Sequence, residues 1–139
     1  MRLKLSDSLF EELKRRCREH FGLPGEHTHE IMVREDAVPI FRGFGPAAFL
    51  TRQGRIFMDP VGYQEGPVYD ATEDEVHIYL NFGAKHLKFL ELLDILPPRP
   101  EHSAICDQCQ GRKWRSSDVN GRDDLWCHRC TAKGWIRLT

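Results

Sequence analysis

Two cysteine pairs near the carboxyl end constrain this chain more than any other feature. Cys106 and Cys109 form one Cys-x-x-Cys pair, and Cys127 and Cys130 form a second, with seventeen residues between the pairs. Both sulfurs of such a pair can face one ion, and a loop of this length can fold back to complete a tetrahedron of thiolates. The spacing is that of a zinc ribbon. We therefore predict one structural zinc ion bound by all four cysteines.

The segment that carries these cysteines is too short to fold on apolar burial alone. It spans residues 104–139, and chains below about 40 residues usually need a metal, a disulfide or a partner to fold. Structural zinc contributes about 10 to 16 kcal/mol of apparent binding free energy. We therefore expect metal binding and folding of this segment to be one event. Gly111 and Gly134 follow the two cysteine pairs and can adopt a positive φ where the chain turns away from the ion.

This segment resembles half-repeats of the zinc domain of DnaJ-type chaperones, in which the repeat reads Cys-x-x-Cys-x-Gly-x-Gly. In the first copy Gly111 matches, and Lys113 stands at the second glycine position. In the second copy Ala132 stands at the first glycine position, and Gly134 matches. The chaperone domain uses four repeats to hold two ions. The resemblance therefore implies a single ion in this chain.

A proline-rich stretch separates the cysteine segment from a larger first domain. Pro97, Pro98 and Pro100 end a predicted helix and form a stiff spacer. We predict a domain at residues 1–98, a linker at 99–103 and the zinc-ribbon module at 104–139.

Apolar periodicity predicts an α+β fold for the first domain, a small antiparallel sheet packed with about three helices. Leu9, Leu13 and Cys17 recur at steps of four and predict a helix over residues 6–20. Two apolar runs around Gln53 and Gly54 predict a β-hairpin. The remaining expectations are strands at 31–33 and 38–41, a loop at 61–70, and helices at 72–83 and 84–96. Capping boxes are predicted at residues 8–11 and 72–75.

The order of these elements is similar to that of the SUKH superfamily. The similarity covers residues 5–100 and rests on the opening helix, the hairpin at 50–57 and the closing helix at 83–100. It implies an α+β domain that binds other proteins, a group that includes toxin-neutralising immunity proteins of bacteria. The superfamily has no catalytic residues to transfer to this chain.

Three further side chains are candidates for a metal-binding or reactive role. His27 and His29 alternate and could contribute to a second metal site, but a surface loop that leads into the strand at 31–33 is the favoured interpretation. Cys17 lies on the apolar side of the first helix. We therefore expect a buried small apolar side chain at that position rather than a reactive thiol.

Catalysis at the metal is not expected. His128 would have to replace a cysteine to ligate the ion and so open a position for water. A deaminase would need a His-x-Glu element with a later Pro-Cys-x-x-Cys. His29 is followed directly by Glu30, and neither cysteine pair follows a proline. We predict that the protein is not an enzyme and takes no small-molecule substrate.

Two kinds of partner are compatible with the second domain. Three tryptophans lie among basic residues, as in proteins that stack single-stranded nucleic acids: Trp114, Trp126 and Trp135, with Arg112, Lys113, Arg115, Arg122, Arg129, Lys133 and Arg137. Residues 104–139 carry 7 basic and 4 acidic side chains, and four thiolates on one zinc ion add two negative charges. The resulting charge is close to neutral. We therefore favour a protein-interaction module over the alternative, a nucleic-acid-binding zinc ribbon.

The remaining bulk properties are those of a cytoplasmic protein. Charged residues precede any apolar run at the start, and no stretch approaches the ~18 apolar residues of a membrane span. All five cysteines are assigned to metal or to a buried core position, which fits a reducing compartment. We expect a monomeric or weakly associating protein without a membrane partner.

Overall fold

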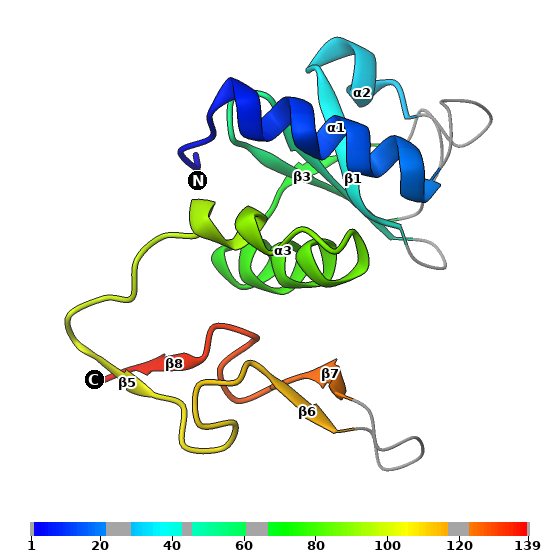
Figure 1. The fold of residues 1–139 in the computed structure, drawn as a ribbon. Helices are drawn as coiled ribbons and strands as arrows, with labels where there is room; N and C mark the ends of the chain where they lie inside the picture. Colours follow the sequence, from blue (N-terminus) through cyan, green and yellow to red (C-terminus); the bar gives the residue numbers. More distant parts are fainter. Residues whose placement is uncertain (1, 22–28, 43–45, 61–66, 117–122, 139) are drawn as a thin grey trace. The chain divides into compact units, whose positions relative to one another are not determined.

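The computed structural model describes residues 2–21, 29–42, 46–60, 67–116 and 123–138, and the chain divides into two compact units, Met1–Leu96 and Pro97–Thr139 (Figure 1). The first unit contains α1 (Asp7–Phe21), α2 (Ile31–Arg34), β1 (Ala37–Arg42), β2 (Ala47–Thr51), β3 (Ile56–Asp59), β4 (Tyr69–Asp70), α3 (Glu73–His86) and the 3-10 helix η1 (Leu90–Ile95). The second contains β5 (Ser103–Ile105), β6 (Trp114–Ser116), β7 (Asp123–Trp126) and β8 (Trp135–Arg137).

The first unit is built on an antiparallel sheet with the strand order β1-β2-β3-β4. The hairpin between β2 and β3 is confirmed, and it turns at Gly54, whose φ is +88°. A Cβ at Gly54 would lie 2.0 Å from the carbonyl oxygen of Leu3. The N–H of Leu3 donates to the carbonyl of Gly54 at 2.7 Å. The glycine therefore allows the amino-terminal segment to lie against the hairpin.

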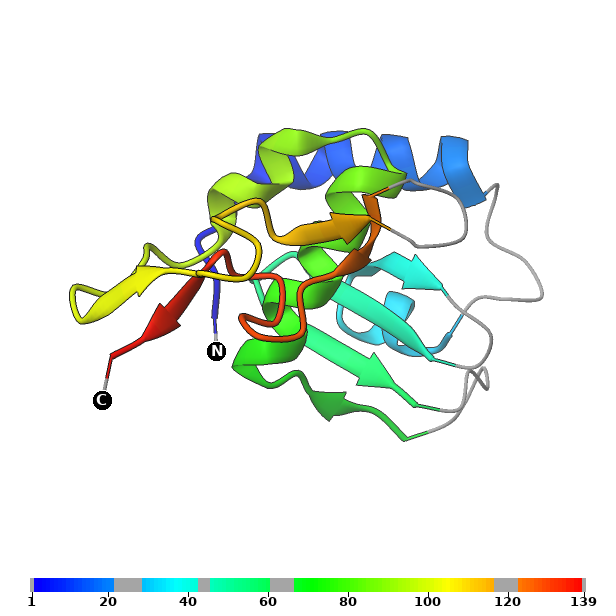
Figure 2. The same cartoon turned by 90° about the horizontal axis from the view of Figure 1, so that it is seen from below.

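Helices pack against both faces of this sheet, and Figure 2 shows α3 crossing the strands. One face carries the main core, in which Phe10 and Leu13 of α1 and Leu80 of α3 pack with Leu50 of β2. Side chains that alternate with these along the strands, such as Phe49, face a smaller cluster with Ile31 of α2. Since both faces are covered, all five residues of β2 are buried. The predicted α+β fold is confirmed.

The predicted strand at residues 31–33 is wrong, because Ile31–Arg34 forms the short helix α2. The N–H of Ile31 donates to Nδ1 of His29 at 3.0 Å, and Arg34 pairs with Glu30 one turn away. These local contacts hold the turn while the buried Ile31 covers the reverse face of the sheet. Burial against a sheet thus overrides the strand preference of an apolar run.

Part of the predicted loop at 61–70 is a strand. Residues 61–66 lie outside the described residues, but Tyr69–Asp70 forms β4 beside β3. Nη2 of Arg55 donates to both carboxylate oxygens of Asp70, at 2.9 and 2.8 Å. This charge-assisted contact favours the extended pairing at the sheet edge.

The predicted boundary between two helices at Gly83 is also wrong. Helix α3 continues through Gly83 to His86, and the chain then forms η1 rather than a long second helix. A Cβ at Gly83 would lie 3.0 Å from the carbonyl oxygen of Ile40. The glycine permits α3 to approach β1 closely and does not end the helix.

The two predicted capping boxes have different outcomes. Thr72 and Glu75 form the expected reciprocal pair at the start of α3, with bonds of 3.2 and 3.0 Å. At the start of α1, the hydroxyl of Ser6 accepts from the N–H of Leu9 at 3.2 Å. The cap is therefore Ser6, and not Ser8 as predicted. Among the described helices, none combines the length and apolar content that a membrane crossing requires.

Candidate metal centre

The four cysteines of the two Cys-x-x-Cys pairs converge in the second unit. Their sulfur atoms all lie within 4.8 Å of one another, and all four residues are buried. Two separations that join the pairs are 3.8 Å between Sγ of Cys106 and Cys127, and 3.7 Å between Sγ of Cys109 and Cys130. A disulfide bond is only about 2.05 Å long, so these are four free thiols around a common centre. They are positioned to bind a metal ion.

Each cysteine pair begins a knuckle, which we define as residues 106–114 and residues 127–135. The two knuckles share one backbone conformation, with positive φ at three equivalent positions: Gln110 (53°), Gly111 (83°) and Lys113 (74°) in the first, and Thr131 (51°), Ala132 (62°) and Gly134 (83°) in the second. Lys113 and Ala132, the two departures from the glycine pattern, thus adopt the left-handed conformation that the pattern requires.

Reciprocal backbone bonds join the knuckles. The N–H of Cys106 donates to the carbonyl of Gly134 at 3.0 Å, and the N–H of Cys127 donates to the carbonyl of Lys113 at 2.8 Å. The strands are paired in the same reciprocal way. β5, which leads into the first knuckle, pairs with β8, which follows the second, and β6 pairs with β7 (Figure 1). The knuckles are therefore related by an approximate two-fold arrangement around the sulfurs.

Backbone N–H groups donate to two of the sulfurs. Burial alone would raise the pKa of the Cys109 thiol, but donation to its sulfur by the N–H groups of Lys113 and Gly111 helps to lower that pKa to about 7. Burial raises the pKa of Cys130 to about 12, although the N–H of Gly134 donates to its sulfur at 3.3 Å. Because interacting thiols titrate as a set, the first proton is lost from the group of sulfurs as a whole.

The side chains between the cysteines face away from the sulfurs. His128 is exposed and stacks on Trp126, with ring centroids 4.0 Å apart. Arg129 donates to the carboxylate of Asp107 at 2.5 Å, so an exposed ion pair links the second knuckle to the first. His128 therefore does not replace a cysteine in this centre.

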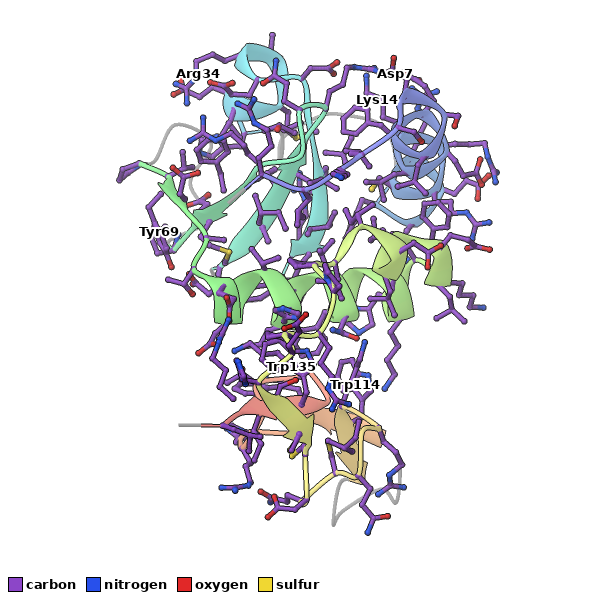
Figure 3. All side chains as sticks on the ribbon, turned by 90° about the vertical axis from the view of Figure 1, so that its left-hand side faces the viewer. Asp7, Lys14, Arg34, Tyr69, Trp114 and Trp135 are labelled. Carbon is purple, nitrogen blue, oxygen red and sulfur yellow. The ribbon has the colours of Figure 1, made fainter. Side chains whose placement is uncertain are left out.

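The tryptophans and basic residues of the second unit are engaged with one another. Trp135 is buried, with Nζ of Lys133 5.4 Å and Cζ of Arg137 5.2 Å from its ring centroid. Trp114 occupies the equivalent position at the end of the first knuckle. It pairs with Trp126 across β6 and β7 and is half-buried. Figure 3 shows Trp114 and Trp135 on the same side of the second unit. The buried ring of Trp135 therefore contributes to packing within the second unit.

His29 is buried, so the predicted surface loop at this position is wrong. Its Nδ1 accepts from the N–H of Ile31, and its Nε2 lies 3.9 Å from a carboxylate oxygen of the buried Asp59. This pair was missed because its members are far apart in the sequence, and the strand pattern ending at Asp59 was its only signal. His27 lies outside the described residues. Among the residues that are described, the four cysteines are the only set of three or more potential ligands that converges.

Cys17 behaves as the sequence predicts. It is buried, and its Sγ donates to the carbonyl of Pro39 at 3.2 Å. Burial raises the pKa of this thiol to about 12, which keeps it protonated and unreactive at neutral pH. The prediction of a buried small side chain is confirmed.

Comparisons with protein-family models, curated proteins and solved structures find no match to this chain. The resemblances to the SUKH superfamily and to DnaJ-type zinc domains therefore stay predictions. Evidence for the function therefore comes from the cysteine centre and the two units themselves.

Proposed function

We propose that this is a non-enzymatic zinc protein, in which four cysteines hold one structural zinc ion and the first unit binds another protein. The convergence of four buried sulfurs carries the proposal. A Zn–S distance of about 2.3 Å places the sulfurs of a tetrahedron about 3.8 Å apart. The separations of Cys106 from Cys127 and of Cys109 from Cys130, 3.8 and 3.7 Å between the sulfurs, agree with that value.

Zinc suits this ligand set better than other divalent ions. Thiolates are soft ligands, and a tetrahedral set of four sulfurs favours zinc or iron over magnesium, calcium or manganese. Zinc has no redox chemistry and no electronic preference among geometries, so it suits a centre whose task is to hold two knuckles together. We therefore assign zinc to the site.

A structural role follows from the closure of the site. Catalytic zinc keeps one position for water or substrate, whereas here four sulfurs are available and each cysteine is at most 3% exposed. His128 lies outside the sulfur group, stacked on Trp126. Metal binding in this unit thus contributes folding free energy rather than a reactive water.

The first unit is the proposed partner-binding part. The SUKH resemblance implies a protein-binding domain, and residues 1–96 carry 12 basic and 16 acidic side chains, a balance that repels a phosphate backbone. In the second unit, Arg129 is paired with Asp107, and Lys133 and Arg137 lie over Trp135. These contacts compete with phosphate and nucleobase binding, so we favour a protein partner for the whole chain.

Metal analysis of matched variants tests the zinc assignment. Protein purified without added metal should contain one zinc ion per chain, and Cys17→Ser should contain the same amount because Cys17 lies in the first unit. Cys106→Ser should lose most of the zinc. Wild-type protein without zinc, or equal zinc in both variants, would refute the assignment.

Nuclease treatment separates the two kinds of partner. The full chain is used as bait in an extract of its source cells, with and without nuclease. Capture of a defined protein that persists after nuclease treatment, with purified components then binding directly, supports a protein partner. Capture that disappears with nuclease, together with salt-dependent oligonucleotide binding that is lost in Arg112→Gln and Arg129→Gln, supports the nucleic-acid alternative.

A further inference from the structure

Lys113 occupies a backbone position that disfavours lysine. Its φ is +74°, and the equivalent residue of the second knuckle is Gly134. A side chain is strained in the left-handed region, whereas glycine is not. The side chain is also half-buried. A residue that is both strained and partly removed from water needs a compensating interaction.

The surroundings of Lys113 connect it to both knuckles. Its carbonyl accepts from the N–H of Cys127 at 2.8 Å, and its own N–H donates to the sulfur of Cys109. A Cβ at Gly134 would lie 3.4 Å from Cγ of Lys113, so the aliphatic stem crosses over the second knuckle. The N–H of Gly134 in turn donates to Sγ of Cys130 at 3.3 Å. The lysine thus runs from one half of the metal centre to the other.

The charge of Lys113 has a partner at this centre. Four thiolates around one divalent ion carry a net charge of −2, and a buried charge is costly unless an opposite charge lies nearby. The position of its Cγ beside Gly134, whose N–H donates to Sγ of Cys130, keeps the lysine charge close to this centre. Arg129 and Arg112 also lie near the cysteines, but Arg129 is exposed and paired with Asp107, and Arg112 donates to the carbonyl of Cys109.

We propose that Lys113 offsets the negative charge of the metal centre and thereby protects its thiolates from electrophiles and slows loss of the ion. This inference rests on the proposed zinc site. It also explains why the position equivalent to Lys113 in the second knuckle is a glycine, because a side chain at Gly134 would meet the carbonyl oxygen of Gly111 at 3.1 Å as well as the stem of Lys113. One lysine therefore serves both halves of the two-fold arrangement.

Reaction with iodoacetamide measures this protection in the zinc-loaded full chain. Each thiolate sulfur forms a bond to carbon as iodide leaves, and a zinc-binding dye reports the released ion. Because iodoacetamide is uncharged, Lys113 does not attract it electrostatically. A change in rate therefore reports the reactivity of the sulfurs rather than recruitment of the reagent. Lys113→Gln should release zinc about tenfold faster than wild type, because solvent screens the attraction between two charges only partly in a half-buried site. Lys113→Arg should stay close to the wild-type rate.

Two further variants separate charge from strain and from general surface charge. Lys113→Gly should fold readily, because glycine adopts this φ without strain, yet it should release zinc as fast as Lys113→Gln. Arg137→Gln removes an exposed positive charge of the same unit that lies over Trp135 rather than against a cysteine, and it should leave the rate unchanged. Wild-type rates in both Lys113→Gln and Lys113→Gly would overturn the role of Lys113 while leaving the zinc site intact. A wild-type protein that holds no zinc would instead refute the proposed function.

Discussion

Cys106 donates its backbone N–H to the carbonyl of Gly134, at 3.0 Å. The first cysteine of one knuckle is therefore held by the last turn of the other, and the reciprocal bond joins Cys127 to Lys113. Neither knuckle is complete without its counterpart. This exchange predicts that the second unit folds and unfolds as a single cooperative body.

Loss of one ligand should therefore disorder the whole second unit. We expect Cys106→Ser or Cys127→Ser to abolish amide protection throughout residues 103–138, while α1, α3 and the β1–β4 sheet keep theirs, because each unit has its own core. Hydrogen exchange measured by mass spectrometry checks this. A chelator added to the wild type should reproduce the pattern. Simultaneous loss of protection in both units would mean that they form one cooperative unit.

The two knuckle glycines should differ in their tolerance of a methyl group. Gly111 and Gly134 both have a φ of +83°, so the conformational cost of alanine is the same, roughly 1 to 2 kcal/mol. A Cβ at Gly134 would lie 3.1 Å from a backbone oxygen, whereas the nearest atom to a Cβ at Gly111 is a side-chain methyl of Ile105 at 3.4 Å.

Gly134→Ala should consequently lose more stability than Gly111→Ala. The free energy of unfolding of the metal-loaded chain, measured by denaturant titration, checks the order. Equal losses would show that backbone strain alone sets the cost, and the reverse order would contradict the clearance at Gly134.

Gly83→Ala should destabilise the first unit even though alanine favours helices. The gain in helix propensity is about 1 kcal/mol, but the added methyl would lie 3.0 Å from the carbonyl oxygen of Ile40 and 3.3 Å from its Cβ. Separating α3 from β1 to relieve that contact should cost about 1 to 3 kcal/mol. Thermal unfolding checks this, with Lys85→Ala at an exposed position of α3 as the control. A higher melting temperature for Gly83→Ala would contradict the close approach.

The first unit should lose stability in alkali through Cys17. Burial raises the pKa of its thiol from 9.0 to about 12. Above pH 9 the unfolded chain ionises this thiol while the folded chain keeps it protonated, so its contribution is complete below pH 9 and is lost as the pH rises to about 12. Cys17→Ala should remove this part of the pH dependence. Urea unfolding of both proteins between pH 8 and pH 11 measures the difference, and parallel curves would contradict a buried thiol.

Signals that act over a few residues were sufficient to predict several elements. The two cysteine pairs, the hairpin that turns at Gly54 and the capping pair of Thr72 and Glu75 each depend on neighbours in the chain. The structure contains all of them. Gly111 and Gly134 adopt positive φ as expected, whereas the positive φ of Ala132 was not predicted because no glycine is present there.

Features set by contacts between distant residues could not be predicted in this way. The apolar run at Ile31 forms a helical turn because it covers the reverse face of the sheet, and Gly83 is required by β1 rather than by its own helix. The buried pair of His29 and Asp59 joins residues from different elements. Each of these depends on the tertiary fold, which local periodicity does not contain.

X-ray absorption spectroscopy at the zinc edge of the purified full chain tests the central claim most directly. The account predicts one zinc ion per chain with four sulfur neighbours at about 2.3 Å and no nitrogen or oxygen neighbour. The same spectrum is expected for Cys17→Ser. A first shell that includes nitrogen or oxygen, or a protein that binds no zinc, would contradict a closed four-cysteine centre.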